Sequence, residues 1–485
     1  MSSESPSCDL GQKWRNETLK WHLQTRAAFI ERLSEKLEHS QDYPTDTPPV
    51  LCKLISATAK TISEKVESID ATQYPHVSQL LQFISEHLRY VERSRIENTP
   101  WSMIQAAESF LKHQVGAKYH FIIRPQWANN YSVTGEFVLA YKTRISAFHP
   151  EVTARWKEIL EESQPFNNED SVFDQKLFCV SFPRVDRLNC LLHANWGHEV
   201  GHIIIEPLMQ SEFPKLWETQ KTCIRRRVEE EMCNSPSPLR EEFQKNAIQQ
   251  IIAFAVDQVM NIAYRGLAEL LCDHIGLHLL GPASIASHLV FSAPHSLDEN
   301  PLNCGNYPPW RYRLRLMKEA CQDITSHLED LKAHSILTPF AQWLEQATKL
   351  AEPQCDKDEI NKNIATKEAY NFIETHWDDL RQQALQRLPP ASKEYSLHAS
   401  KCTIAELVQR LDEGIIPNET GFFPDTEPAS FENILNAAWV FAIKKLQAET
   451  WGTADDFEKL FRLTLKAIES SFVQKVFGEK LKAAK

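Results

Sequence analysis

The chain has 485 residues, 42% of them hydrophobic, so it can bury a large core and form about two to four domains or subdomains. The formal net charge of −12 and the lack of a basic tail exclude nucleic acid as the default partner. Glycine is scarce, with 13 residues, which favours helices over turn-rich folds.

The sequence carries no sign of export or membrane insertion. Residues 1–14 lack an apolar core, so no secretory signal is expected. No stretch approaches the roughly 18 uncharged apolar residues of a membrane span. The 11 cysteines are scattered, odd in number and free of C-x-x-C pairs, which is typical of reduced thiols. We therefore expect a cytoplasmic protein without membrane insertion; the sequence does not predict its oligomeric state.

The first part of the chain has helical periodicity. Helices are predicted over 10–39, 50–69 and 75–96, and another begins near Pro100. The character changes at Lys118, where β-branched and aromatic residues become frequent. Residues 1–115 are therefore interpreted as an N-terminal helical region.

A short strand-rich part follows. Tyr119–Arg124 and Tyr131–Thr143 partly alternate and predict a small antiparallel sheet. A helix near 149–163 precedes another strand, Lys176–Phe182. These strands lead directly into the motif around which the rest of the interpretation is built.

That motif lies in Leu191–Glu206 and reads His198-Glu199-Val200-Gly201-His202, an H-E-x-x-H. On a helix the two histidines project from one face, one turn apart, and their ring nitrogens can bind one Zn²⁺. Glu199 then lies beside the metal, placed to take a proton from water. The five residues alone are a moderate signal, so a third ligand is required.

The third ligand is predicted on a long helix at about 239–280. Glu269 and Asp273 are four residues apart on one face of this apolar helix. Glu269 is the expected metal ligand, and Asp273 is expected to accept a hydrogen bond from the other ring nitrogen of a ligand histidine. His274 or His278, on the same helix, could replace either acid. Cys272 is interpreted as a core residue on a different face.

Further along, residues 307–313 contain groups that could stabilise charge in a transition state. Tyr307, Arg311 and Arg313 are the candidates, with Tyr307 and Arg311 preferred as catalytic residues. A helix is predicted from Trp310 past residue 330. The alternative is that these arginines lie on its surface. Residues 346–485 are predicted to form a C-terminal helical region.

The order His198-Glu199-x-x-His202, then Glu269-x-x-x-Asp273, resembles the gluzincin metallopeptidases, particularly the HtpX and CAAX-prenyl endopeptidase type. It is similar in the same two motifs to the ImmA/IrrE-like cytosolic proteases. The resemblance covers residues 185–315 and implies that the histidines and the later glutamate bind zinc, with the first glutamate as base. In the membrane endopeptidases a His-Pro segment and an arginine often follow; here Tyr307 stands in place of that histidine.

These observations predict an α+β, mainly helical fold. A zincin-like catalytic core with a small antiparallel sheet, residues 116–345, is flanked by the helical regions 1–115 and 346–485. The expected function is that of a soluble zinc metallopeptidase, specifically a metalloendopeptidase. It would hold one Zn²⁺ per chain and hydrolyse a protein or peptide substrate through a zinc-activated water, with Glu199 as general base.

Two other classes stay open. The protein could be a non-enzymatic helical interaction protein whose metal is structural or absent. It could also be a di-iron helical protein, for which Glu199-x-x-His202 would be one Glu-x-x-His pair, but the sequence lacks a second.

Overall fold

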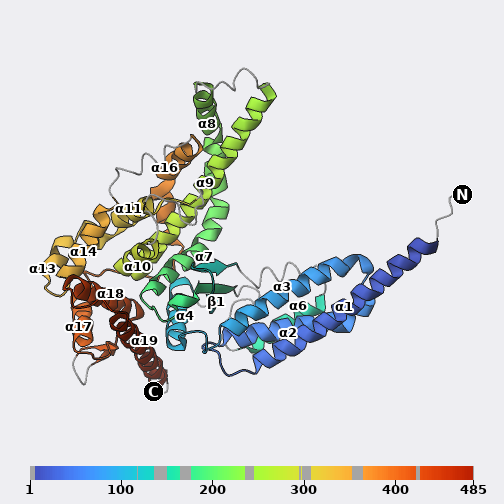
Figure 1. The fold of residues 1–485 in the computed structure, drawn as a ribbon, viewed down its shortest axis with the longest axis horizontal. Coiled ribbons are helices and arrows are strands. Elements are labelled where there is room, and N and C mark those ends of the chain that lie inside the picture. Colours follow the sequence, from blue (N-terminus) through green and yellow to red (C-terminus); the bar gives the residue numbers. More distant parts are fainter. Residues whose placement is uncertain are drawn as a thin grey trace. The chain divides into compact units, whose positions relative to one another are not determined.

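The computed structural model describes residues 6–116, 118–135, 150–163, 176–234, 245–293, 297, 307–351, 364–390, 392–421 and 426–483. Within them the chain is mainly helical, with a few short strands (Figure 1). This confirms the predicted predominance of helices. None of the described helices combines the length and apolar content needed to cross a membrane.

The chain forms two compact units. Unit 1 comprises Met1–Lys112 and Gly116–Arg187, and unit 2 comprises His113–Val115 and Leu188–Lys485. The boundary after Arg187 lies inside the region 116–345 that the sequence predicted as one core. The predicted strands therefore belong to unit 1, whereas both motifs that the sequence predicts to bind metal belong to unit 2.

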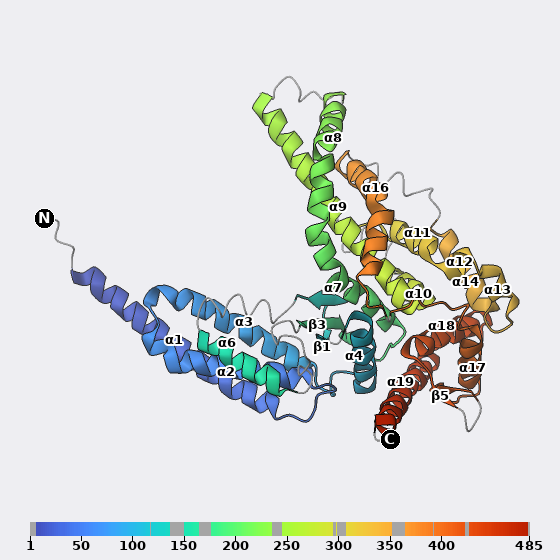
Figure 2. The same cartoon turned by 180° about the vertical axis from the view of Figure 1, so that it is seen from behind.

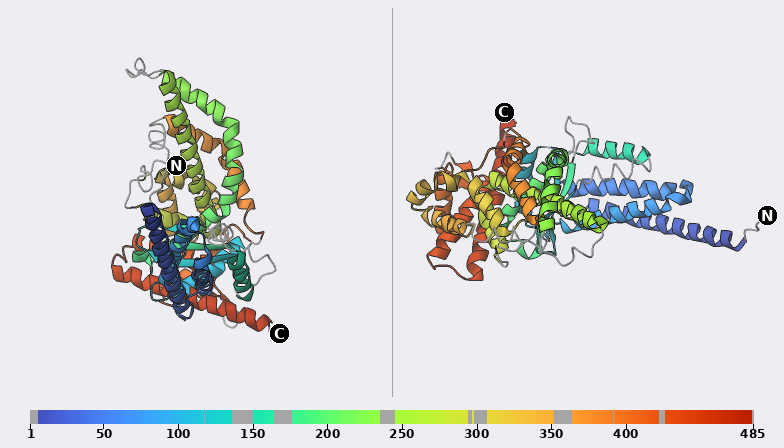
Figure 3. Two further views of the ribbon diagram at one scale, coloured as in Figure 1. Left: turned by 90° about the vertical axis from the view of Figure 1, so that its right-hand side faces the viewer. Right: turned by 90° about the horizontal axis from the view of Figure 1, so that it is seen from above.

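Unit 1 is a helical bundle in which α1, α2, α3 and α6 run side by side (Figures 1 and 3). Its helices are α1 (Pro6–Glu38), α2 (Thr47–Lys65), α3 (Tyr74–Arg93), α4 (Trp101–Val115) and α6 (Pro150–Glu162). The indole of Trp156 on α6 donates to the hydroxyl of Thr58 at 2.9 Å and to the carbonyl of Leu54 at 3.1 Å. These buried hydrogen bonds fix the register of α6 against α2.

The small sheet of unit 1 is mixed, so the prediction of an antiparallel sheet is wrong. Strands β1 (Tyr119–Gln126), β3 (Lys176–Pro183) and β2 (Ser132–Thr134) are ordered β1-β3-β2. β1 pairs with β3 in parallel, and β2 pairs with β3 antiparallel. The chain between β1 and β3 passes through α6, the kind of long connection that parallel strands require. Residues 136–143 of the second predicted strand lie outside the described residues.

In unit 2 the long helix α9 packs against both α7 and α16 (Figure 2). The first helices of this unit are α7 (Trp196–Ser211), α8 (Phe213–Asn234), α9 (Lys245–Leu280), α10 (Pro282–Ser292), α11 (Trp310–Ala320) and α16 (Ile364–Gln386). Trp196, Val200 and Ile203, on the side of α7 opposite the motif histidines, are buried. The helix that begins at Trp310 ends at Ala320, because Cys321 is extended, so its predicted continuation past residue 330 is wrong.

The remaining elements of unit 2 are α12 (Gln322–Thr325), α13 (Leu328–Ala333), α14 (Thr338–Lys349), α17 (Lys401–Asp412), β4 (Glu419–Thr420), β5 (Glu427–Pro428), α18 (Phe431–Gln447) and α19 (Ala454–Ala483). The buried Asn436 of α18 holds the junction between α9 and α10. Its amide nitrogen donates to the carbonyl of Leu280 at 2.9 Å, and its oxygen accepts from the N–H of Ala283 at 3.1 Å. Gly281 lies between them with φ +59°, a conformation that favours glycine.

Candidate metal centre

Glycines allow the backbones of α7 and α9 to touch where they cross. A Cβ added at Gly201 would lie 2.7 Å from the Cα of Cys272, and one at Gly197 would lie 3.0 Å from the Cα of Gly276. Both distances are shorter than a carbon–carbon contact of about 3.5 Å. The absence of side chains at these positions therefore brings the histidine-bearing face of α7 directly onto the acidic face of α9.

Glu269 of α9 lies opposite both histidines of the H-E-x-x-H motif. Its Oε2 is 3.4 Å from Nε2 of His198, and its Oε1 is 3.6 Å from Nε2 of His202. The centres of the two imidazole rings are 5.0 Å apart, and their planes are nearly perpendicular, at 88°. The structure thus brings together the three residues predicted as metal ligands, from two helices that are distant in the sequence.

Asp273 and Arg313 hold His198 and Glu269 in place through hydrogen bonds and an ion pair. Nδ1 of His198 donates to Oδ1 of Asp273 at 2.8 Å, because a carboxylate only accepts, and this leaves Nε2 facing Glu269. Arg313 donates to both oxygens of Asp273 at 2.7 Å, and its Nη2 is 3.4 Å from Glu269. Asp273 therefore occupies the place predicted for it, and its hydrogen bond orients the His198 ring.

The charges of these groups are strongly coupled. Burial lowers the pKa of His198, but hydrogen bonds to Asp273 and Glu269 outweigh it and raise this pKa to about 10. Burial and the charge of His198 lower the pKa of His202 to about 4. Burial raises the pKa of Glu269, but His198 and Arg313 outweigh it and bring this pKa to about 2. The pocket therefore favours ionised carboxylates and a protonated His198 between them, and a metal ion would have to replace that proton.

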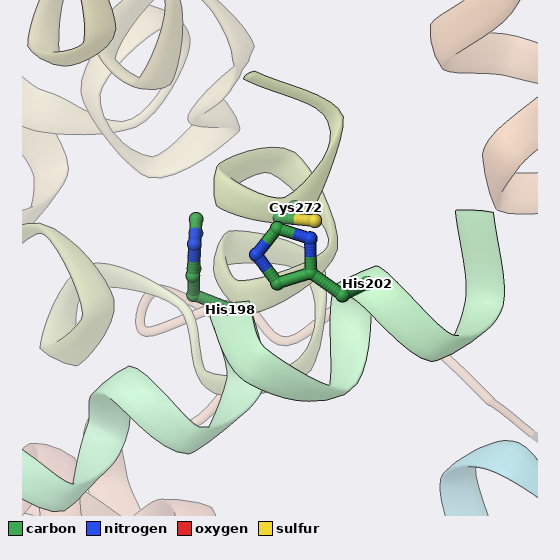
Figure 4. A group of neighbouring side chains, drawn as sticks. All are labelled: His198, His202 and Cys272. Atoms are coloured by element: carbon green, nitrogen blue, oxygen red, sulfur yellow. The ribbon is translucent and has the colours of Figure 1, made fainter. Parts of the chain in front are cut away.

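Cys272 also belongs to this cluster, which the sequence interpretation missed. Its sulfur and one nitrogen each of His198 and His202 all lie within 4.8 Å of one another, and Figure 4 shows Cys272 on α9 beside the His202 ring. Burial, with the charges of Glu269 and other nearby acids, raises the pKa of the thiol. The signal was present in the sequence, because a residue three positions after Glu269 is only about 60° away around the helix.

The remaining catalytic candidates are placed differently. Glu199 is buried on α7, and its charge raises the pKa of the Cys272 thiol. Arg311 directs its guanidinium to the carbonyl of Leu350, whereas Arg313, two residues later, reaches Asp273 and Glu269. Tyr307 is half-buried just before α11, and its role stays a prediction.

The competing histidines of α9 face elsewhere. His274 meets Trp377 of α16 edge-on, with ring centres 6.2 Å apart, and burial lowers its pKa to about 3. Burial lowers the pKa of His278 to about 4. Glu269 and Asp273 are the α9 residues that contact His198, which disfavours either histidine as a replacement for them.

The donor set fits a zinc ion, since two imidazoles and a carboxylate are ligands that zinc takes in proteins. Oε2 of Glu269 lies 3.4 Å from Nε2 of His198, and its Oε1 lies 3.6 Å from Nε2 of His202. Once His198 is neutral, Asp273 and Glu269 carry one more negative charge than Arg313 neutralises, which favours a cation in place of the His198 proton. Glu199 adds a further buried carboxyl group. His198, His202 and Glu269 could therefore hold a divalent ion, with Cys272 as a possible fourth ligand.

No family model matches the chain, and neither a curated protein nor a solved structure matches it. The interpretation of the site therefore depends on its own residues and their geometry.

Proposed function

We propose that the protein is a zinc-dependent metallopeptidase that hydrolyses a protein or peptide substrate. The observation that carries the proposal is the position of Glu269, whose two oxygens face the Nε2 atoms of His198 and His202 at 3.4 Å and 3.6 Å. The hydrogen bond from His198 to Asp273 supports it, since ligand histidines usually donate their other N–H to a carboxylate. The likeness to gluzincin motifs agrees with this geometry.

His198, His202 and Glu269 would hold the ion. When bound, zinc supplies a Lewis acid that polarises a carbonyl group and makes water more acidic. Glu199 is the general base in this proposal: its carboxylate takes a proton from the attacking water and gives it to the departing amine. Arg313 holds Asp273 in the orientation that fixes the His198 ring, so it acts as a positioning residue.

The test compares wild-type protein with Glu199→Gln and Glu269→Ala. We expect about one zinc per wild-type chain, the same content in Glu199→Gln, and loss of zinc in Glu269→Ala. Cleavage of a mixed peptide library should fall by at least about 100-fold in Glu199→Gln, the scale of a lost general base. Wild-type cleavage by Glu199→Gln would refute the mechanism, and a metal-free wild type would refute the site.

One observation favours a second candidate, a non-enzymatic helical interaction protein with a structural metal. The Cys272 sulfur lies close enough to both histidines to be a fourth ligand, and structural zinc sites are closed by four protein ligands. Cobalt substitution distinguishes the two candidates. A sulfur-to-cobalt charge-transfer band that disappears in Cys272→Ser, together with no peptide cleavage by wild type, would favour the structural site. Without that band, the fourth position is open for catalysis.

A further inference from the structure

A second group of metal-ligating side chains lies in unit 2 and shares no residue with the zinc site. His327 immediately precedes α13, Asp330 lies in its first turn, and His398 lies in the turn before α17. One ligand atom from each of the three lies within 4.8 Å of the others. We propose that His327, Asp330 and His398 form a second, exchangeable site for a transition-metal ion of the zinc, nickel or cobalt type.

The two imidazoles are neighbours. Their rings stack with centres 4.2 Å apart and planes inclined by 8°, and Nε2 of His398 is 3.5 Å from Oδ2 of Asp330. An imidazole nitrogen binds an ion in the plane of its ring, so one ring has to turn out of the stack for both to bind the same ion. Asp330 follows His327 by one helical turn, so both lie on the same side of α13. Two imidazoles and a carboxylate are the donor types that zinc and nickel bind in proteins.

A buried carboxylate holds the two parts of this site in place. Asp323 of α12 accepts hydrogen bonds from the hydroxyl of Ser396 at 2.8 Å and from the N–H groups of Leu397 at 2.6 Å and His398 at 2.9 Å. Asp323 is 2% exposed and is joined to His327 by a few residues of chain. The backbone of His398 is therefore fixed against the segment that carries His327, without help from a metal.

Lys401 is the group that opposes metal binding. Its ammonium lies 3.3 Å from Nε2 of His398, the nitrogen that faces Asp330. An incoming cation has to displace it, which the flexible lysine chain allows because its end can move into water. The Asp330 side chain is 67% exposed and free to rotate toward the ion. Three protein ligands leave a position for water, and the exposed Asp330 lets the ion exchange with solution.

The experiment is a calorimetric titration of full-length protein with Zn²⁺, and separately with Ni²⁺, after removal of loosely bound metal. Wild type should bind one equivalent beyond the metal that it retains. His398→Ala and Asp330→Asn should each weaken this event by at least about tenfold, the loss caused by removing even an outer partner of a metal ligand. Lys401→Met should tighten it, because the competing charge is gone.

His76→Ala, which removes an exposed histidine of α3 in unit 1, is the matched control and should bind like wild type. Asp330→Asn changes a surface residue, so its folding can be verified by an unchanged circular dichroism spectrum. The proposal is overturned if wild type shows no additional equivalent, or if Asp330→Asn and His398→Ala bind it as tightly as wild type. Weaker binding by Lys401→Met would equally contradict it. None of these outcomes depends on peptide cleavage or on Glu269.

Discussion

Arg313 carries a buried positive charge that two carboxylates share. Its guanidinium donates to both oxygens of Asp273 and lies near Glu269. A buried ion of this kind is costly unless every charge near it is compensated. Arg313 is therefore the residue through which α11 contributes to the site: it lies 3.4 Å from the proposed ligand Glu269 and acts on His198 through Asp273.

We expect Arg313→Met to destabilise the protein by about 3–5 kcal/mol, because Asp273 loses its buried partner. Zinc affinity should fall by about 10–100-fold, because Asp273, which orients His198, is no longer held in place by Arg313. Arg311→Met is the matched control from the same helix. It removes a hydrogen bond to Leu350 and should cost about 1 kcal/mol or less. Urea unfolding and competition with a zinc chelator measure both effects, and equal losses in the two variants would contradict the prediction.

At the scale of single residues, the sequence predicted much of the site, because the spacing of residues along one helix decides which of them share a face. It placed His198 and His202 on one face and Glu269 with Asp273 on another, and the structure brings these faces together. It preferred Arg311 to Arg313, because nothing local fixes which side of α11 faces the site. Its interpretation of Cys272 as a core residue is confirmed by complete burial, but it missed that the thiol also lies near His198 and His202, which the spacing from Glu269 could have indicated.

At the scale of elements, the crossing of α7 and α9 decides whether the site exists. The crossing depends on close approach of two backbones, which glycine permits at Gly197, Gly201 and Gly276. Gly201 is the fourth residue of the H-E-x-x-H motif, a position whose side chain does not bind the metal, so the ligand chemistry alone would allow any residue there. In this chain the packing of α7 on α9 restricts that position to glycine.

Gly201→Ala should destabilise the protein by about 1–3 kcal/mol, the usual cost of overpacking, because its Cβ would meet the α9 backbone at 2.7 Å. Zinc affinity should fall as the two helices move apart. Gly478→Ala on α19 is the control, since an added Cβ there meets no described atom within 4 Å. The control should stabilise its helix by up to about 1 kcal/mol. Thermal unfolding with and without a chelator gives both values; a Gly201→Ala variant as stable as wild type would contradict the tight crossing.

The helices were easier to predict than the sheet for a physical reason. The helical periodicity of α1, α2 and α3 depends only on the residues of each segment itself. The predicted bounds of these helices agree with the observed ones to within a few residues. The pairing of β1 with β3 depends on a distant part of the chain, with α6 between them. Strand propensity indicated that both strands exist, but it contains no information about the direction in which they pair.

At the scale of the molecule, the division into two units separates the sheet of β1, β2 and β3 from the proposed metal ligands. All residues of the candidate zinc site and of the second metal site lie between 188 and 485. The sequence predicted regions divided near residues 115 and 345, the first of them where the composition changes at Lys118. The contacts divide the chain after Arg187, since β1 pairs with β3 and contacts α2 and α3, and α6 packs on α2.

A fragment containing residues 188–485 should fold by itself, because it includes nearly all of unit 2. We expect it to unfold cooperatively and to retain zinc. The complementary fragment 1–187 is the control and should carry no stoichiometric zinc. Metal analysis and urea unfolding of both fragments test the division. An unfolded fragment 188–485 would show that unit 2 depends on unit 1.

The contacts of Leu191 have a consequence for the order in which the site is completed during synthesis. The carbonyl of Leu191 accepts hydrogen bonds from Ser287 and from the indole of Trp439, which is 248 residues further along the chain. A ribosome therefore releases both histidines and Glu269 well before Trp439 has been made. Helices α7 and α9 emerge as an incomplete layer, and the segment just before α7 acquires its partner Trp439 only when α18 leaves the exit tunnel. Cys190 of the same segment meets Phe461 of α19 later still.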